Sequence, residues 1–306
     1  MFRTVVCVKQ IRHIYARTGL DPATHFIAAA DVVNIVNPLD ELAVEAAVRL
    51  RDAQGGGEVV VLTLGELLAE EELRRCLAMG ADRLIRLDAP CFRDLDAWAT
   101  GVVLAAAARR LDPDLVLCGR RALDDCSGQV PAIIAGQLGT PLVCRVVGLE
   151  VNAAARKVVA HRALDRGDRE IVECFLPAVL AVDKGINEPR YPALPALLGS
   201  REAGIEVWDA SLLGLDPAAT RPLTRVVRLY PPRPRARKIK APDSSLSAQA
   251  RIQMLMGGGA APKKKEGARI LELPVPEAAR KVLEFFIEHK ALPDPRPQVV
   301  HTPPPA

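Results

Sequence analysis

The sequence predicts an α/β protein with a doubly wound, mostly parallel β-sheet, to which an antiparallel strand region and an extended C-terminal arm are added. Within residues 1–140, apolar β-branched runs alternate with helical patterns, which is the order of parallel βαβ units. The chain has 306 residues, of which 49% are hydrophobic but only 4% are aromatic. A core of Ala, Val and Leu suits helices packed on a parallel sheet, and a chain of this length can bury such a core.

Each expected element has a local signal. Residues 3–8 are an apolar, β-branched run typical of a strand. A helix over 37–50 is predicted because Asn37 can act as the N-cap, Pro38 suits the first helical turn, and Asp40 lies three residues after the cap. By similar criteria we expect strands at 58–64, 83–87 and 115–119, and helices at 67–79, 94–111 and 128–138.

The pattern changes from residue 142. Runs at 142–150, 157–163 and 170–175 predict antiparallel strands, and 178–182 rejoins the sheet. The segment NEPRYPALP at 187–195 is too rich in proline for a helix or a central strand. After it come a basic arm at 230–242, a short helix at 247–256, a Gly- and Lys-rich linker and an amphipathic helix at 276–290. We expect three regions: an α/β domain at 1–228, a C-terminal arm at 229–292 and a disordered tail at 293–306.

Composition and motifs narrow the function. The 41 basic and 37 acidic residues leave a dispersed net charge of +4, which argues against binding to nucleic acid. The seven cysteines form no CxxC pair, so we interpret them as buried hydrophobes in a reducing compartment rather than disulfides or metal ligands. Without a signal-peptide pattern or a membrane-length apolar run, the protein is expected to be soluble and cytoplasmic. Because P-loop, GxGxxG, HExxH and GxSxG motifs are missing and the five histidines are scattered, we expect no catalytic residue and no metal site.

The clearest candidate site follows the strand at 115–119. The strand runs into a polar loop and then into a helix, and Ser127 and Gly128 fall near the start of that helix. Free backbone N–H groups and the helix dipole favour a phosphate there. Equally, Ser127 can be a plain N-cap and Gly128 a turn residue. Cys7, Asn37 and Leu64 end neighbouring strand-like segments or open the helices after them, where open α/β sheets bind ligands, but each can also be a core or cap residue.

The segment 187–195 is stiff and presents Tyr191 and Leu194 to solvent. Such a surface suits the recognition of a protein partner, and a loop that covers the end of the domain is an equal alternative. The basic stretch at 233–240 can contact an acidic surface, although a solvated tail is slightly favoured.

Five segments, in order, resemble the beta subunit of the electron transfer flavoproteins. They are VVCVKQI near the N-terminus, NPLDELAVEAAVRL at 37–50, LRRCLAMGADR at 73–83, PDLVLCGRRALDDCSGQVPA at 113–132 and NEPRYPALP at 187–195. The resemblance implies an adenine-nucleotide-binding fold and a heterodimer with an alpha subunit, which carries the redox-active FAD. This chain would shield that FAD and act as an electron carrier rather than a stand-alone enzyme, since the redox chemistry belongs to the cofactor.

The resemblance also implies a nucleotide pocket. In most relatives it holds AMP as a structural ligand, and in bifurcating relatives it holds a second FAD that oxidises NADH. Bifurcating relatives commonly have Asp-Gly-Asp-Thr where this chain has Asp-Asp-Cys-Ser at 124–127. The implied cofactor-binding residues are Cys7, Asn37, Pro38, Leu39, Asp40, Leu64, Asp124, Asp125, Cys126, Ser127, Gly128, Gln129 and Val130.

Partners follow from the same resemblance. Leu194 would anchor the chain on an acyl-CoA dehydrogenase, and electrons would pass towards a quinone oxidoreductase, as in fatty acid β-oxidation. The helix after the segment lacks the lysines usual in the family, and Tyr15 is a candidate for tuning the flavin. The region 243–267 is longer than usual, and we expect it to contact the alpha subunit or a further partner. The implied docking residues are Asn187, Glu188, Pro189, Arg190, Tyr191 and Leu194.

Overall fold

A computed structural model describes residues 1–14, 31–216, 218, 220–227, 247–249, 251–252 and 273–289. The chain divides into two compact units, Met1–Pro231 and Pro232–Ala306. In the second unit the amphipathic helix predicted at 276–290 is confirmed as α7, Val275–Glu288. Of the short helix predicted at 247–256, residues 248–249 and 251–252 are helical. Tyr15, the arm at 230–242 and the tail at 293–306 lie outside the described residues.

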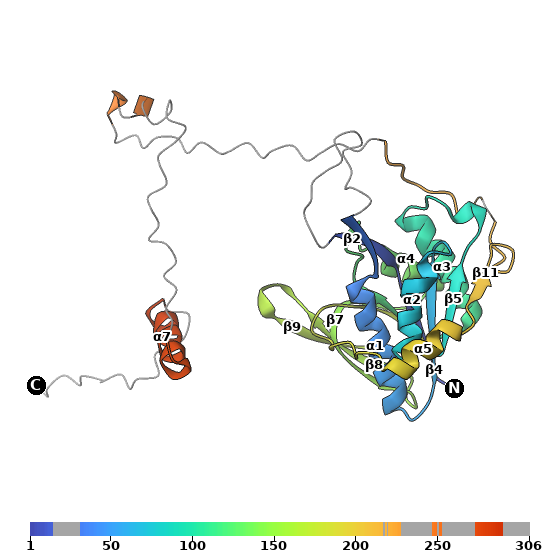
Figure 1. The fold of residues 1–306 in the computed structure, drawn as a ribbon, viewed down its shortest axis with the longest axis horizontal. Coiled ribbons are helices and arrows are strands. Elements are labelled where there is room, and N and C mark those ends of the chain that lie inside the picture. The colour runs from blue at the N-terminus through green and yellow to red at the C-terminus, as the bar shows by residue number, and fades with distance from the viewer. Residues whose placement is uncertain are drawn as a thin grey trace, which may run out of the picture. The chain divides into compact units, whose positions relative to one another are not determined.

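The first unit is built on a large sheet, confirming the predicted α/β class (Figure 1). Nine strands follow one another in the order β11 (Glu206–Trp208), β5 (Arg83–Leu87), β4 (Glu58–Leu64), β1 (Arg3–Cys7), β6 (Leu115–Gly119), β10 (Ala178–Val182), β7 (Leu142–Asn152), β8 (Lys157–Ala163) and β9 (Arg169–Phe175). All pairs from β11 to β7 are parallel, whereas β7, β8 and β9 pair antiparallel. A separate antiparallel pair joins β2 (Gln10–Ile14) and β3 (Val32–Val36).

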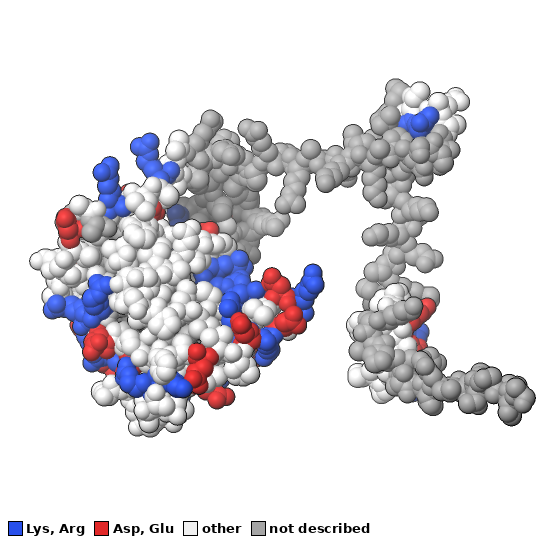
Figure 2. Space-filling model, turned by 180° about the vertical axis from the view of Figure 1, so that it is seen from behind, with Lys and Arg blue, Asp and Glu red and all other residues white. Residues whose placement is uncertain are grey.

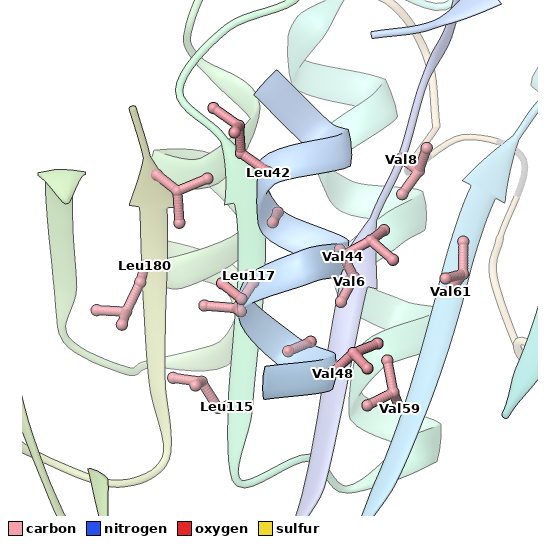
Figure 3. Close-up of a cluster of buried hydrophobic side chains, with 14 of the residues drawn as sticks. Val6, Val8, Leu42, Val44, Val48, Val59, Val61, Leu115, Leu117 and Leu180 are labelled. Carbon is pink, nitrogen blue, oxygen red and sulfur yellow. The ribbon is translucent and has the colours of Figure 1, made fainter. Parts of the chain in front are cut away.

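Helices cover both faces of this sheet. The full set in the first unit is α1 (Pro38–Ala53), α2 (Ala69–Ala78), α3 (Ala97–Leu111), α4 (Val130–Leu138) and α5 (Leu194–Glu202), with 3₁₀ turns at Pro90–Phe92 and Asp165–Gly167. One apolar core contains residues of α1 and α2, and the other contains residues of α3 and α4. Strand residues alternate between these cores because successive side chains of a strand point to opposite faces. Val6 of β1 thus joins the first core, where Val44 and Val48 of α1 pack over the strands (Figure 3), and Val5 joins the second.

The antiparallel region differs from the prediction at β7. Its first residues pair parallel to β10, and only the stretch from Val146 onwards pairs antiparallel to β8. The register shifts between Val146 and Gly148, so one strand serves both parts of the sheet. The prediction of an entirely antiparallel strand at 142–150 was therefore wrong for its first half. The parallel partner, β10, comes later in the chain and inserts between β6 and β7.

The segment 187–195 also departs from the prediction at its end. Leu194 and Pro195 open α5, although the prolines were expected to exclude any helix. Proline is accepted in the first turn of a helix because the N–H that it lacks has no partner there.

Among the described helices, none is long and apolar enough to cross a membrane. On the face shown in Figure 2, basic and acidic side chains alternate around a broad uncharged area.

Candidate functional site

A cavity of about 570 Å³ lies where four parallel strands end. The last residues of β1, β4, β5 and β6, which are Cys7, Leu64, Leu87 and Gly119, all line it. Open α/β sheets bind ligands outside the carboxyl ends of their strands. The cavity therefore occupies the position that the fold offers to a ligand.

The cavity walls combine an apolar part with a charged rim. Phe92, Leu95 and Leu104 form an apolar wall, and Lys9, Arg93 and Arg121 are basic residues in the lining. Of the residues predicted to bind a cofactor, the lining contains Cys7, Asn37, Asp40, Leu64, Asp125, Ser127, Gly128 and Val130. It does not contain Pro38, Leu39, Asp124, Cys126 or Gln129, which are close in sequence to lining residues.

Asn37 supports the loop after β6 rather than capping α1. It occupies the N-cap position, but its side chain makes no capping hydrogen bond. Instead, Nδ2 donates to the carbonyl of Arg121 (3.1 Å), and Oδ1 accepts from the N–H of Leu123 (3.3 Å). The predicted N-cap position is confirmed, but the side chain binds this loop, which offers the amide both a donor and an acceptor. Asn37 thereby fixes one wall of the cavity.

Asp40 is a buried carboxyl group in the cavity lining. It accepts hydrogen bonds from the backbone N–H groups of Lys9 (2.8 Å) and Gly119 (3.0 Å). Burial raises its pKa from 3.8 to about 7, and the hydrogen bonds from Lys9, Asn37 and Gly119 oppose that shift. Asp40 thus ties the first turn of α1 to the ends of β1 and β6.

The loop at 120–129 carries paired charges at the edge of the cavity. Lys9 Nζ lies 2.9 Å from Asp124 and 3.1 Å from Asp125. Asp125 also accepts a hydrogen bond of 2.9 Å from the N–H of Ser127. Burial acts to raise the pKa of Asp125, but the hydrogen bonds from Ser127 and Lys9 outweigh it and lower that pKa. The loop therefore keeps a negative charge beside Ser127.

Backbone donors lie where α4 begins. Gly128 has a φ of 62°, a conformation that glycine adopts readily. Within the part of the chain that the structure describes, no acceptor is recorded for the N–H groups of Gly128, Gln129 and Val130. Gly128 and Val130 line the cavity. The first N–H groups of a helix have no partner inside the helix, so this end of α4 can receive an anion.

The predicted docking residues lie on a different part of the unit, along α1. Asn187 donates to the carbonyl of Leu42 (3.0 Å), and Arg190 pairs with Glu45 (2.8 Å). Tyr191 and Leu194 remain 86% and 68% exposed. Apolar side chains exposed on a well-anchored backbone are a common feature of protein interfaces.

The described residues include no group of three or more His, Cys, Asp or Glu side chains placed to hold a metal ion. All seven cysteines are free, and Cys7, Cys76 and Cys118 are buried as expected. Contrary to the expectation, Cys126 is exposed in the loop before α4, and the remaining three, Cys91, Cys144 and Cys174, are only partly buried.

The lining residues that sequence reasoning missed come mainly from the strand and turn around residues 87–96. Leu87 ends β5, and Phe92 and Asp96 precede α3. The position of Leu87 at the end of a predicted parallel strand was an available signal. Lys9 and Arg93 line the cavity because of the course of their loops, and no local sequence pattern indicated this.

Comparisons with known proteins agree with this fold. Residues 24–213 match the family described as electron transfer flavoprotein domain. Subunit CarD of the caffeyl-CoA reductase-Etf complex of Acetobacterium woodii is 37% identical over 218 residues, covering 71% of this chain and 82% of CarD. FixA of Azorhizobium caulinodans is 34% identical over 80% of this chain and 90% of its own length. The electron transfer flavoprotein subunit beta of Thermoanaerobacterium thermosaccharolyticum is 38% identical over 69% of this chain and 80% of its own length. The chain therefore belongs to the electron transfer flavoprotein family, as a subunit of the beta type.

Proposed function

We propose that this electron-transfer subunit binds AMP in the cavity at the ends of β1, β4, β5 and β6. The AMP is a structural ligand, and the redox-active FAD belongs to an alpha subunit that this chain partly shields. That FAD supplies the electron transfer, so the role of this chain is geometric and electrostatic. The proposal is supported by one observation: the same cavity contains an apolar wall and, at the start of α4, backbone N–H groups without a recorded acceptor.

The residues of the cavity fit a mononucleotide in chemistry and in size. The N–H groups of Gly128 and Val130 suit a phosphate, because the positive end of a helix dipole favours an anion. Phe92 and Leu104 offer an apolar surface to a planar base. A cavity of about 570 Å³ is within the range of pockets that bind small molecules.

The nucleotide content of the purified heterodimer tests this proposal. The chain is produced with its alpha subunit, the ligands are released by denaturation, and they are separated by chromatography. One FAD and one AMP for each heterodimer are the expected result. Two FAD molecules without AMP would overturn the assignment.

A second candidate is a bifurcating subunit, in which a second FAD occupies the cavity and oxidises NADH. It is favoured by the similarity to CarD, because CarD is named as a subunit of a reductase complex. The Asp-Asp-Cys-Ser sequence at 124–127 favours AMP instead. Rapid reduction of bound flavin by NADH, together with a second FAD, would support this candidate.

We also propose that residues 187–194 dock an acyl-CoA dehydrogenase, which donates electrons for transfer towards a quinone oxidoreductase. Leu194 is the proposed anchor, since it is 68% exposed at the start of α5. Leu194→Ala is expected to slow electron uptake from a reduced acyl-CoA dehydrogenase and to leave the FAD content intact. Uptake at the wild-type rate would show that the docking assignment is wrong.

A further inference from the structure

The segment before the exposed Tyr191 is fastened along α1 by side chain to backbone hydrogen bonds. Asn187 Nδ2 donates to the carbonyl of Leu42 at 3.0 Å. Arg49 Nη2 donates to the carbonyl of Glu188 at 2.8 Å. Both bonds connect residues far apart in the sequence, so they fix the course of the segment rather than its local turn.

Glu45 is the central residue of this attachment. Its side chain is only 2% exposed, and Oε2 accepts from both the backbone N–H (3.1 Å) and the Nε (2.8 Å) of Arg190. Oε1 accepts from Arg49 Nε at 2.5 Å. A carboxylate taken out of water is costly unless it is paired and hydrogen-bonded. Here both oxygens are engaged, and the partners come from the segment and from the helix itself.

This arrangement decides how the next residues are presented. Arg190 is held at both its backbone and its guanidinium group, and Pro192 is buried. Between these fixed points, Tyr191 is 86% exposed, and Leu194 follows at 68%. Fixing a loop in its binding conformation lowers the entropy lost when a partner binds. The exposed side chains are therefore preorganised by a residue that no partner can contact.

We infer that Glu45 is a positioning residue, which holds Arg190 and thereby orients Tyr191 and Leu194 for docking. The inference rests on the docking role proposed above, but it concerns the buried anchor rather than the docking surface. Glu45 acts through Arg190 and does not itself touch the electron donor.

The test compares three variants of the heterodimer, in each of which one charged side chain is replaced by glutamine. Glu45→Gln leaves one acceptor oxygen for Arg49 and Arg190. Its NH₂ group then faces one of these two donors and cannot accept a hydrogen bond from it. Arg190→Gln removes the partner on the exposed side, where misfolding is a smaller risk. Glu41→Gln is the matched control, because Glu41 is also a carboxylate of α1 but pairs with Arg75 (2.9 Å) and not with the segment. The measurements are amide hydrogen exchange at 187–193, and KM and kcat with a reduced acyl-CoA dehydrogenase as donor.

Both Glu45→Gln and Arg190→Gln are expected to speed exchange at 187–193 and to raise KM for the dehydrogenase about tenfold, with kcat and nucleotide content unchanged. The double variant should resemble either single variant in exchange at 187–193, because both changes break the same Glu45–Arg190 ion pair. The control should match the wild type. Unchanged exchange in both Glu45→Gln and Arg190→Gln would overturn the inference. Faster exchange with an unchanged KM, in these variants and in Leu194→Ala, would overturn the docking proposal and leave the anchor supported.

Discussion

The carboxylate of Asp40 lies against the backbone of Gly119, with 3.0 Å between Oδ1 and the amide nitrogen. This contact joins the first turn of α1 to the end of β6 at the cavity. It requires a residue without a side chain, since a Cβ at position 119 would lie 2.2 Å from Asp40 Oδ1 and 2.9 Å from Leu39.

Gly119→Ala is expected to destabilise the fold by about 1–3 kcal/mol, because the added methyl group overlaps a buried carboxylate and the Leu39 backbone. Thermal unfolding of the heterodimer measures the change. Gly136→Ala is the control, since a Cβ there meets no atom within 4 Å and alanine favours the helix. Equal stability of the two variants would contradict the steric argument.

Asp40→Asn is expected to change how stability depends on pH. Burial raises the pKa of Asp40 from 3.8 to about 7, so between these values the folded chain keeps a proton that the unfolded chain releases. The contribution of Asp40 to the free energy of unfolding therefore falls as pH rises, by roughly 1.4 kcal/mol for each pH unit, and is constant above pH 7.

Denaturant unfolding of the wild type and of Asp40→Asn from pH 4 to pH 8 isolates this effect, because other carboxylates contribute equally to both. The stability of the wild type relative to the variant should decline up to about pH 7 and then stay level. A constant difference across the range would mean that Asp40 is ionised throughout.

The sheet was predictable where the signal is local. A strand that is buried on both faces of a parallel sheet is a continuous apolar run, and such runs at 3–8 and 115–119 predicted β1 and β6. The apolar stripe at helical spacing likewise predicted α1. The parallel half of β7 was not predictable, since its partner β10 lies beyond two intervening strands in the sequence. No local pattern records which strand inserts beside it.

The site was predictable to a similar degree. Cys7 and Leu64 could be found because they end strands, and Ser127 and Gly128 because they precede a helix. Asn37 was found because it opens a helix, but the hydrogen bonds of its amide to the loop at Arg121 and Leu123 were not predicted. Hydrogen bonds between segments so far apart have no signature in a single sequence.

Asp96→Asn is expected to release the chain at 223–224 while keeping the start of α3 intact. Oδ1 of Asp96 caps the helix through the N–H of Ala99 (2.9 Å). Oδ2 accepts from the N–H groups of Leu223 (2.9 Å) and Thr224 (2.8 Å) and from the Thr224 hydroxyl (2.9 Å). Asparagine retains the capping oxygen, but its NH₂ group cannot accept these three bonds.

Limited trypsin cleavage after Arg225 measures this release, and its rate should rise about tenfold because cleavage follows local opening. Asp94→Asn is a close control, since asparagine tolerates the φ of 53° at that position. An unchanged cleavage rate in Asp96→Asn would show that other contacts hold the segment.

Ser127→Asp tests the phosphate site by charge alone. Ser127 lines the cavity beside Gly128 and precedes Gln129, the N-cap of α4, by two residues, so the substitution leaves the helix itself unchanged. Its carboxylate would repel a bound phosphate, so the affinity for AMP should fall by about tenfold or more, while the FAD of the alpha subunit is retained. Ser127→Asn introduces a side chain of nearly the same shape as aspartate but without the charge, and this variant should bind AMP like the wild type. Isothermal titration with AMP, after removal of the endogenous nucleotide, measures both variants. Equal affinities in Ser127→Asp and Ser127→Asn would mean that no phosphate binds at the start of α4.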